Sequence, residues 1–290
     1  MMNGILDKYG YVPDREKIGR ALDLIAGNLD QMMTREVLMN CFSLMDLTTL
    51  KPDDTAASVA KLVDKVTALR EQYPSYPLPA SICVYPNFAS LVAARRCSPE
   101  LHVTTVAGCF PSSQSFPEVK ARECELAVLN GADEVDIVLA LNAFLDEDFT
   151  RAGEEIALMR RAVGAATLKV ILETGLLVSV EKIAAASFLA MENGADFIKT
   201  STGKVEVNAT PIAAFVMCEC IRRFYEITGK KVGFKAAGGI SNDRDAAVYY
   251  AIVSSVLGKE WLDKDHFRFG VSRLGNSLMS AIEGETVNFF

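Results

Sequence analysis

Histidine and closely spaced cysteine, the side chains that most often bind transition metals, are scarce in this chain of 290 residues. It has two histidines, His102 and His266, and its seven cysteines include no Cys-x-x-Cys pair. Structural zinc sites and iron–sulfur clusters need several such ligands at short spacing. We therefore expect no metal site. An odd number of cysteines in a long chain also favours reduced thiols, as in a cytoplasmic protein, over a disulfide framework.

An excess of positive charge and a long apolar run are also missing. Thirty Lys and Arg against 37 Asp and Glu give a net charge of −7, so no overall positive field attracts a nucleic acid. No apolar stretch reaches the ~18 residues of a membrane helix, and no basic start followed by an apolar segment marks a signal peptide. We expect neither nucleic acid nor membrane as a partner. Any phosphate should be small and held by local groups.

Short apolar segments alternate with stretches of helical spacing eight times along the chain. Apolar strands joined by helices predict parallel pairing with both faces covered, and eight such units close into a barrel. We predict an α/β fold: a single (β/α)8 TIM barrel over residues 41–290, preceded by an N-terminal helical extension over residues 1–40. A doubly wound open sheet is the alternative if fewer segments are strands. The predicted strands are 42–47, 79–85, 102–108, 133–139, 168–174, 196–201, 231–236 and 266–270.

The boundaries of one helix are predicted from local sequence. Ser115 and Glu118 have the spacing of a capping box, with Pro117 in the first turn, so a helix should begin near residue 116. Asn130-Gly131 should end it, because these residues adopt the left-handed conformation at low cost.

Polar residues near the ends of predicted strands are candidates for a functional site, because the loops after the strands form the active face of a barrel. These residues are Asp46, Cys83, Asp136, Glu173, Lys199, Lys235 and Ser272.

Lys199 and Lys235 are embedded in two consecutive apolar segments, and Gly233 leaves room beneath Lys235. Two ammonium groups close together in a partly dry site disfavour each other, so one loses its proton near neutral pH. A neutral lysine attacks carbonyl groups and forms a Schiff base. The residues alone do not indicate which lysine is the nucleophile. Asp136 would either move protons or pair with an ammonium.

Glycine-rich loops beside the two lysines predict a site for an anion. Thr200-Ser-Thr-Gly203-Lys204 follows Lys199, and Ala237-Gly238-Gly239 follows Lys235, so backbone amides can approach a ligand closely. Barrels often bind phosphate after their last two strands, where Ser272 and Arg273 also lie. Together these features favour a phosphorylated ligand.

Seven segments, in order, resemble the signature segments of the deoxyribose-phosphate aldolase family. They are MDLTTL (45–50), SICVYPNF (81–88), GADEVDIV (131–138), LKVILETG (168–175), FIKTSTGKVEVNATP (197–211), VGFKAAGGIS (232–241) and FRFGVSRL (267–274). They cover most of residues 41–283. The resemblance implies a class I aldolase that reversibly cleaves 2-deoxy-D-ribose 5-phosphate to D-glyceraldehyde 3-phosphate and acetaldehyde through a lysine Schiff base, in deoxyribonucleotide catabolism.

The resemblance also implies a role for individual residues. Lys199 would form the Schiff base, Lys235 would lower its pKa, and Asp136 would transfer protons. The substrate-binding residues would be Asp46, Thr48, Cys83, Gly203, Lys204, Gly238, Gly239 and Ser272. We expect a cytoplasmic enzyme without cofactor. Its partners would be small phosphorylated sugar and aldehyde substrates, with a homodimer as its assembly.

Three residues depart from the common family pattern, and two other functions remain open. Ala236 stands where many members have proline, Arg273 where a second serine is common, and Phe290 ends the chain where some relatives have a tyrosine that assists proton transfer. One alternative is a phosphosugar isomerase or synthase barrel whose lysines bind substrate without a covalent bond. The other is a non-catalytic barrel that binds a phosphorylated metabolite.

Overall fold

Eight short strands at the centre of the computed structural model, which describes residues 2–290, form one closed parallel barrel. Each strand pairs with its neighbours in the chain, and the last strand pairs with the first. The predicted α/β barrel is confirmed, and the open sheet is excluded. The strands are β1 (Met45–Thr48), β2 (Ser81–Val84), β3 (His102–Val106), β4 (Glu134–Val138), β5 (Thr167–Ile171), β6 (Phe197–Lys199), β7 (Gly233–Ala237) and β8 (Phe267–Val271).

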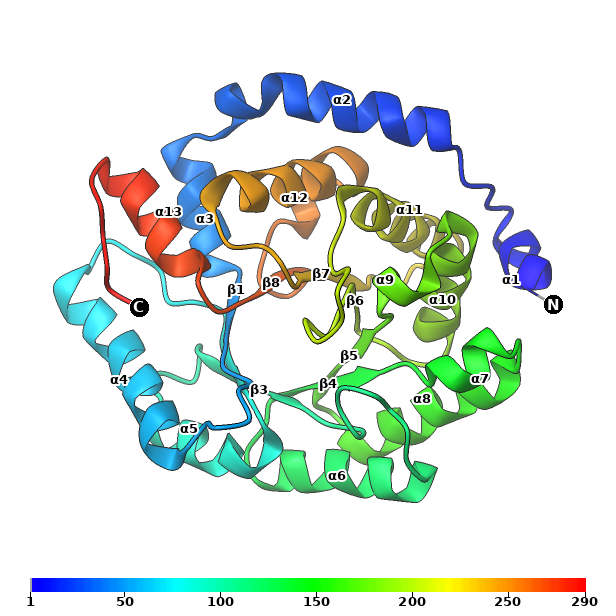
Figure 1. The fold of residues 1–290 in the computed structure, drawn as a ribbon, viewed down its shortest axis with the longest axis horizontal. Helices are drawn as coiled ribbons and strands as arrows, with labels where there is room; N and C mark the ends of the chain where they lie inside the picture. The colour runs from blue at the N-terminus through cyan, green and yellow to red at the C-terminus, as the bar shows by residue number, and fades with distance from the viewer. Residues whose placement is uncertain (1) are drawn as a thin grey trace.

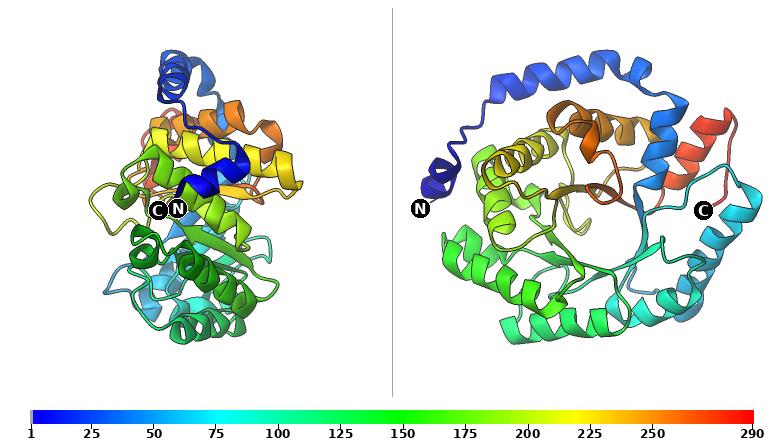
Figure 2. Two further views of the ribbon diagram at one scale, coloured as in Figure 1. Left: turned by 90° about the vertical axis from the view of Figure 1, so that its right-hand side faces the viewer. Right: turned by 180° about the vertical axis from the view of Figure 1, so that it is seen from behind.

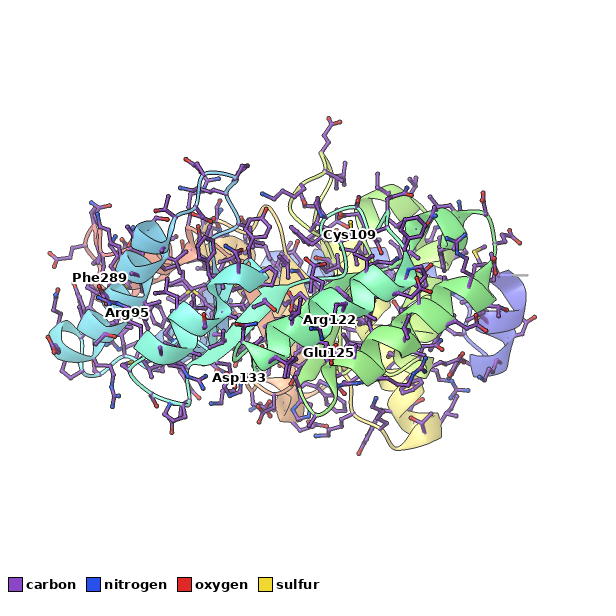
Figure 3. All side chains as sticks on the ribbon, turned by 90° about the horizontal axis from the view of Figure 1, so that it is seen from below. Arg95, Cys109, Arg122, Glu125, Asp133 and Phe289 are labelled. Atoms are coloured by element: carbon purple, nitrogen blue, oxygen red, sulfur yellow. The ribbon has the colours of Figure 1, made fainter. Side chains whose placement is uncertain are left out.

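Helices surround the barrel as a ring (Figure 1). They are α3 (Arg35–Ser43), α4 (Ala56–Gln72), α5 (Ala89–Arg95), α6 (Pro117–Leu129), α7 (Leu141–Leu145), α8 (Phe149–Val163), α9 (Thr174–Leu177), α10 (Val180–Glu192), α11 (Pro211–Thr228), α12 (Asp243–Val256) and α13 (Leu274–Glu283), with short 3-10 turns η1 (Pro86–Phe88) and η2 (Lys259–Trp261). Their outer faces carry charged side chains, such as the paired Arg122 and Glu125 of α6 (Figure 3). Within residues 2–290, no helix has the length and apolarity needed to cross a membrane.

Two N-terminal helices, α1 (Met2–Tyr9) and α2 (Arg15–Met32), lie outside this ring (Figure 2). The ring of Tyr9 stacks on Phe188 of α10 with centroids 4.1 Å apart, and its hydroxyl donates to Glu192 at 2.7 Å. Helix α3 crosses the predicted boundary between residues 40 and 41 and packs on α13. The division into an extension and a catalytic domain therefore stays a prediction.

The parallel register brings charged residues of neighbouring strands to the same level. Lys199 of β6 lies beside Lys235 of β7, which in turn lies beside Arg268 of β8. Asp136 of β4 lies beside Lys169 of β5. The apolar residues that alternate with these charges along each strand, such as Phe234, pack in the layer between the strands and the helices. The barrel interior is therefore the place where buried charges meet.

Candidate active site

Asp136, Lys199 and Lys235 converge inside the barrel from three different strands. The Nζ atoms of both lysines donate to one oxygen, Oδ2 of Asp136, at 2.8 Å each. The two nitrogens therefore lie less than twice that distance apart. All three side chains are buried, and only Lys199 keeps any exposed surface, at 4 %. The crowded lysine pair expected from the sequence is present, and a carboxylate lies between its members.

The two lysines differ in the direction of their pKa shifts. Burial lowers the pKa of Lys199, the positive charge of Lys235 lowers it further, and Asp136 only partly opposes both. Burial also acts to lower the pKa of Lys235, but the charges of Asp136 and Asp46 outweigh it and raise that pKa. Lys199 is therefore the lysine that loses its proton more readily. These opposite shifts distinguish two residues that the sequence alone left equivalent.

Asp136 is the acceptor that the two lysines share. Its burial acts to raise the pKa of the carboxyl, but the positive charges of Lys169, Lys199 and Lys235 outweigh that effect and hold the pKa well below its usual range. Asp136 is therefore ionised at neutral pH.

A further set of buried charges lies beside this cluster, and the sequence reasoning missed most of it. Nζ of Lys169 is 3.3 Å from Oδ1 of Asp136 and also pairs with Glu134. Arg268 donates to Glu134 at 2.7 Å and to Asp46 at 2.5 Å. Lys169, Glu134 and Arg268 are all buried. A signal was present, because charges at alternate positions of an apolar strand share its inner face.

Asp46 and Cys83 are among the predicted substrate-binding residues, but neither lines the pocket described next. The carboxylate of Asp46 pairs with Lys235 and accepts from Ser81 at 2.7 Å. Burial acts against ionisation of Asp46, but the nearby positive charges lower its pKa to about 2. Cys83 is fully buried, which raises the pKa of its thiol to about 11. Asp46 therefore pairs with Lys235, and Cys83 is a buried, protonated thiol.

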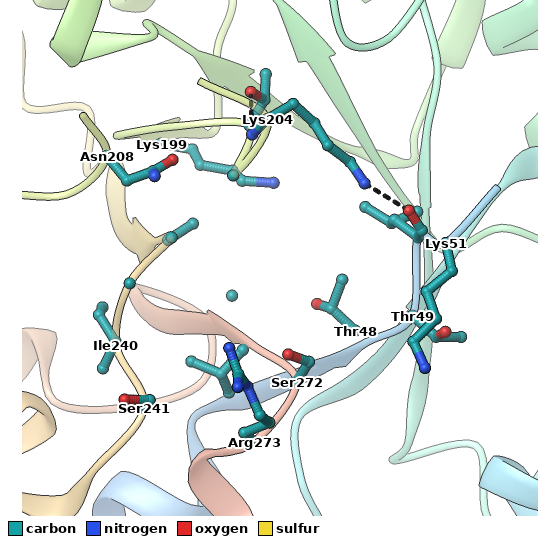
Figure 4. Close-up of a pocket in the computed structure, with 18 residues that line it drawn as sticks. Thr48, Thr49, Lys51, Lys199, Lys204, Asn208, Ile240, Ser241, Ser272 and Arg273 are labelled. Atoms are coloured by element: carbon teal, nitrogen blue, oxygen red, sulfur yellow. Dashed lines mark hydrogen bonds between the residues drawn. The ribbon is translucent and has the colours of Figure 1, made fainter. Parts of the chain in front are cut away.

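The mouth pocket, a cavity of about 340 Å³, opens above Lys199. The amine of Lys199 points into its open centre (Figure 4). Six of the predicted substrate-binding residues line it: Thr48, Gly203, Lys204, Gly238, Gly239 and Ser272. Lys51 and Arg273 add positive charge to the lining, and the guanidinium of Arg273 points toward the open centre (Figure 4). The predicted glycine loops are thus brought together beside the lysine.

Two glycine loops of the mouth pocket depend on conformations that favour glycine. Gly203, Gly238 and Gly239 have φ values of +78°, +85° and +83°. A Cβ on Gly238 would lie 2.6 Å from Oδ1 of Asn208, so a side chain there would collide with the neighbouring loop. Across the mouth, Nζ of Lys204 donates to the carbonyl of Leu50 at 2.6 Å (Figure 4).

The C-terminal tail does not reach the mouth pocket. Oδ1 of Asn276 accepts from the backbone amides of Phe289 at 2.9 Å and Phe290 at 2.7 Å. The ring of Phe290 packs near Phe42, with centroids 6.2 Å apart, and the chain ends between α13 and α4 (Figure 1). The tail therefore fills a space in the helix ring. Within residues 2–290, no group of three or more His, Cys, Asp or Glu side chains is arranged to hold a metal ion.

The fold and this cluster define a (β/α)8 barrel with paired buried lysines beneath a positively charged pocket, a class to which many enzymes belong. The family model described as DeoC/LacD family aldolase matches residues 41–274, and the chain belongs to this family. It is therefore an aldolase, a carbon–carbon lyase. This membership favours aldol chemistry over the isomerase, synthase and non-catalytic alternatives.

Relatives and solved structures agree with this assignment. A protein of Caenorhabditis elegans is 41% identical over 263 residues, 90% of this chain and 86% of that protein. The deoxyribose-phosphate aldolase of Bos taurus is 39% identical over 247 residues, 82% of this chain and 78% of that protein. The structure of QR15, an aldolase, is 28% identical, with a TM-score of 0.66 over 84% of this chain and 95% of that one. The tetrameric deoxyribose phosphate aldolase of Aeropyrum pernix, 23% identical with a TM-score of 0.66, shares the fold over 92% of this chain and 98% of its own.

Proposed function

We propose that the chain is a class I aldolase that reversibly cleaves 2-deoxy-D-ribose 5-phosphate to D-glyceraldehyde 3-phosphate and acetaldehyde through a Schiff base on Lys199. One observation carries this proposal: Lys199 and Lys235 share an oxygen of Asp136, yet only Lys199 lines the pocket and has a lowered pKa. The name of the Bos taurus relative supports this substrate.

In the proposed reaction, the neutral amine of Lys199 attacks C1 of the open-chain sugar, and loss of water leaves a protonated imine. The positive nitrogen withdraws electrons as the bond between C2 and C3 breaks. The C3 hydroxyl loses its proton and becomes the aldehyde of D-glyceraldehyde 3-phosphate. The enamine left on Lys199 is protonated at C2, and water then releases acetaldehyde and the free lysine.

The neighbours of Lys199 divide the remaining work. Lys235, whose pKa is raised, stays charged, and its positive charge lowers the pKa of Lys199. Asp136 is ionised and its Oδ2 is 2.8 Å from the reacting amine, so it is placed to pass protons to and from that amine between steps. Asp46 acts indirectly, because it pairs with Lys235 and fixes its position.

We assign the substrate phosphate to the side of the mouth pocket formed by Gly203, Lys204, Gly238, Gly239 and Ser272. Left-handed glycines expose backbone amides there, and helix α13 begins at Leu274, directly after this lining. Thr48 also lines the pocket and would contact the sugar. The proposal needs no cofactor. It places the enzyme in the cytoplasm, in deoxyribonucleotide breakdown, and a homodimer stays the predicted assembly.

Trapping with sodium borohydride tests the Schiff base. Reduction in the presence of acetaldehyde should inactivate the enzyme and leave an ethyl group on Lys199, located by peptide mass spectrometry. The Lys199→Arg variant, which keeps the charge, should acquire no such group. An active wild-type enzyme that shows no adduct would contradict the covalent mechanism and favour lysines that bind substrate by charge alone.

A further inference from the structure

Glu173 is a buried carboxylate that the proposed mechanism does not use. It follows β5, is 2 % exposed, and does not line the mouth pocket. No lysine, arginine or histidine of residues 2–290 lies within ion-pair distance of it. Its φ of +54° is in the left-handed region, which residues other than glycine rarely adopt. Such a conformation persists where the surroundings hold it, and often near functional sites.

The carboxylate of Glu173 is directed at one residue of the mouth pocket, Thr202. Oε1 accepts from the backbone amide of Thr202 at 3.1 Å, and Oε2 accepts from its hydroxyl. A hydroxyl has one proton, so that proton is committed to Glu173. Toward any other partner the Thr202 oxygen can therefore act only as an acceptor, and it accepts from the backbone amide of Lys204 at 3.1 Å. Glu173 thus sets the turn from Thr202 to Lys204.

The residues that follow Glu173 in the loop after β5 also contact the loop that contains this turn. The amide of Thr174 donates to the carbonyl of Thr200 at 2.9 Å. Gly175 approaches the far end of the β6 loop so closely that a Cβ would lie 2.0 Å from the carbonyl oxygen of Val207. The loop after β5 therefore contacts both sides of the glycine turn that we assign to phosphate.

We propose that Glu173 is a positioning residue that holds Thr202, Gly203 and Lys204 in the conformation that binds the substrate phosphate. This inference rests on the proposed function for the identity of the substrate. It acts on binding of the phosphate group and leaves the chemistry at Lys199 unchanged. The enzyme's preference for a phosphorylated sugar over the free sugar depends on it.

The Glu173→Gln variant tests the inference, because glutamine keeps the size of the side chain but replaces one acceptor with a donor. In one orientation, the side-chain NH2 of the glutamine faces the backbone N–H of Thr202. In the other, it faces the Thr202 hydroxyl, whose proton points toward residue 173 in the wild type. We expect KM for 2-deoxyribose 5-phosphate to rise about tenfold with kcat changed less than about threefold. The value of kcat/KM for unphosphorylated 2-deoxyribose should stay the same, so the ratio between the two sugars falls.

Two further variants separate positioning from a general loss of structure. Thr202→Val removes the hydroxyl that links Glu173 to Lys204, so the double variant Glu173→Gln/Thr202→Val should be clearly less impaired than the two single effects combined. Glu155→Gln neutralises another buried glutamate, which pairs with Lys120 and lies away from the mouth pocket. It should lower the melting temperature without changing the ratio between the sugars.

The outcomes decide the inference separately from the proposed function. Equal losses with both sugars, additive effects in the double variant, or tighter phosphate binding through removal of a negative charge would each overturn it. If the wild-type enzyme cleaves neither sugar, the proposed function fails. In that case, calorimetric titration with inorganic phosphate tests the role of Glu173 by itself. Binding about tenfold weaker in Glu173→Gln supports the positioning role, and unchanged or tighter binding refutes it. Should Glu173→Gln not fold, Thr202→Val gives the same two readouts.

Discussion

Two buried lysines, Lys120 in the helix layer and Lys199 inside the barrel, show what distinguishes a structural lysine from a reactive one. Both are almost inaccessible, at 1 % and 4 % exposure. Nζ of Lys120 has three acceptors: the carbonyl of Ser113 at 2.9 Å, its hydroxyl at 3.2 Å, and the carboxylate of Glu155. An ammonium has three protons to donate, so that site is saturated.

Within residues 2–290, Lys199 has a single hydrogen-bond partner, Asp136, and it faces the mouth pocket. Its other protons have no acceptor in this part of the chain, and Lys235 adds positive charge beside it. Burial therefore lowers the pKa of Lys199, the charge of Lys235 lowers it further, and the one carboxylate only partly opposes both. Burial is common to both lysines, and the difference in partners separates an ion pair between helices from a candidate nucleophile.

The largest expected effect comes from removing each lysine in turn. Lys199→Ala should lower kcat/KM by about four orders of magnitude or more, because the covalent step is lost, while the protein remains folded. Lys120→Ala should destabilise the protein by about 3 kcal/mol, since it removes the buried partner of Glu155 and leaves that carboxylate only Arg151, whose Nε is 3.3 Å away, and it should leave borohydride trapping intact. Steady-state kinetics and chemical denaturation of both variants measure the contrast. Equal losses of activity in the two variants would show that Lys199 and Lys120 do not differ in their roles.

The second prediction concerns the positive charge of Lys235. In Lys235→Leu, the carboxylate of Asp136 acts on Lys199 without the opposing charge, so the pKa of Lys199 should rise. Because only the neutral amine reacts, the rising limb of the pH–rate profile should move to higher pH, and kcat at neutral pH should fall about 100-fold. A Lys235→Leu enzyme with the wild-type profile would show that burial alone lowers the pKa.

The positions of the strands and of the two site lysines could be predicted from sequence, because they depend on patterns that local physics preserves. All eight predicted strands exist, although β1 begins at residue 45 because Phe42 and Ser43 complete α3. Helix α6 ends as predicted at Asn130, with Gly131 at a φ of +97°. Its predicted capping box is wrong. The N-cap is Phe116, without a side-chain hydrogen bond, because Ser115 belongs to the preceding turn.

The inside of the barrel could not be predicted from sequence in the same way. Gly233 was interpreted as making room for Lys235, but its missing side chain makes room for Phe197, whose ring a Cβ would approach to 2.3 Å. Lys169 lies in mid-strand, away from the strand ends where the barrel fold predicts functional residues. Which charges meet depends on how neighbouring strands are staggered in a closed barrel, and that stagger is a property of the whole ring.

The third prediction, with a smaller expected effect, concerns Asp46, one of the two carboxylates that pair with Lys235. Its pKa of about 2 lies below the ordinary value of 3.8. The carboxylate therefore contributes about 2 kcal/mol of stability above pH ~4, which is lost as the pH falls toward 2. Asp46→Asn should flatten this part of the stability curve, measured by denaturation between pH 2 and pH 7 at intervals of about one unit. An acid limb as steep as in the wild type would assign the loss to other carboxylates, with Asp136 and Glu134 first to be tested.

The smallest expected effect is that of Arg273, an exposed cation whose side chain points into the mouth pocket. In contrast to the buried lysines, it is solvated in the absence of substrate, so its contact with a phosphate should be worth only about 1 kcal/mol. Arg273→Ala should therefore raise KM for 2-deoxyribose 5-phosphate about fivefold and leave kcat unchanged. Arg122→Ala, on the outer face of α6, is the matched control, since it removes the same charge far from the pocket. Equal KM values for the two variants would show that Arg273 acts only on the overall charge of the surface, and the phosphate would then be held by backbone amides and Lys204.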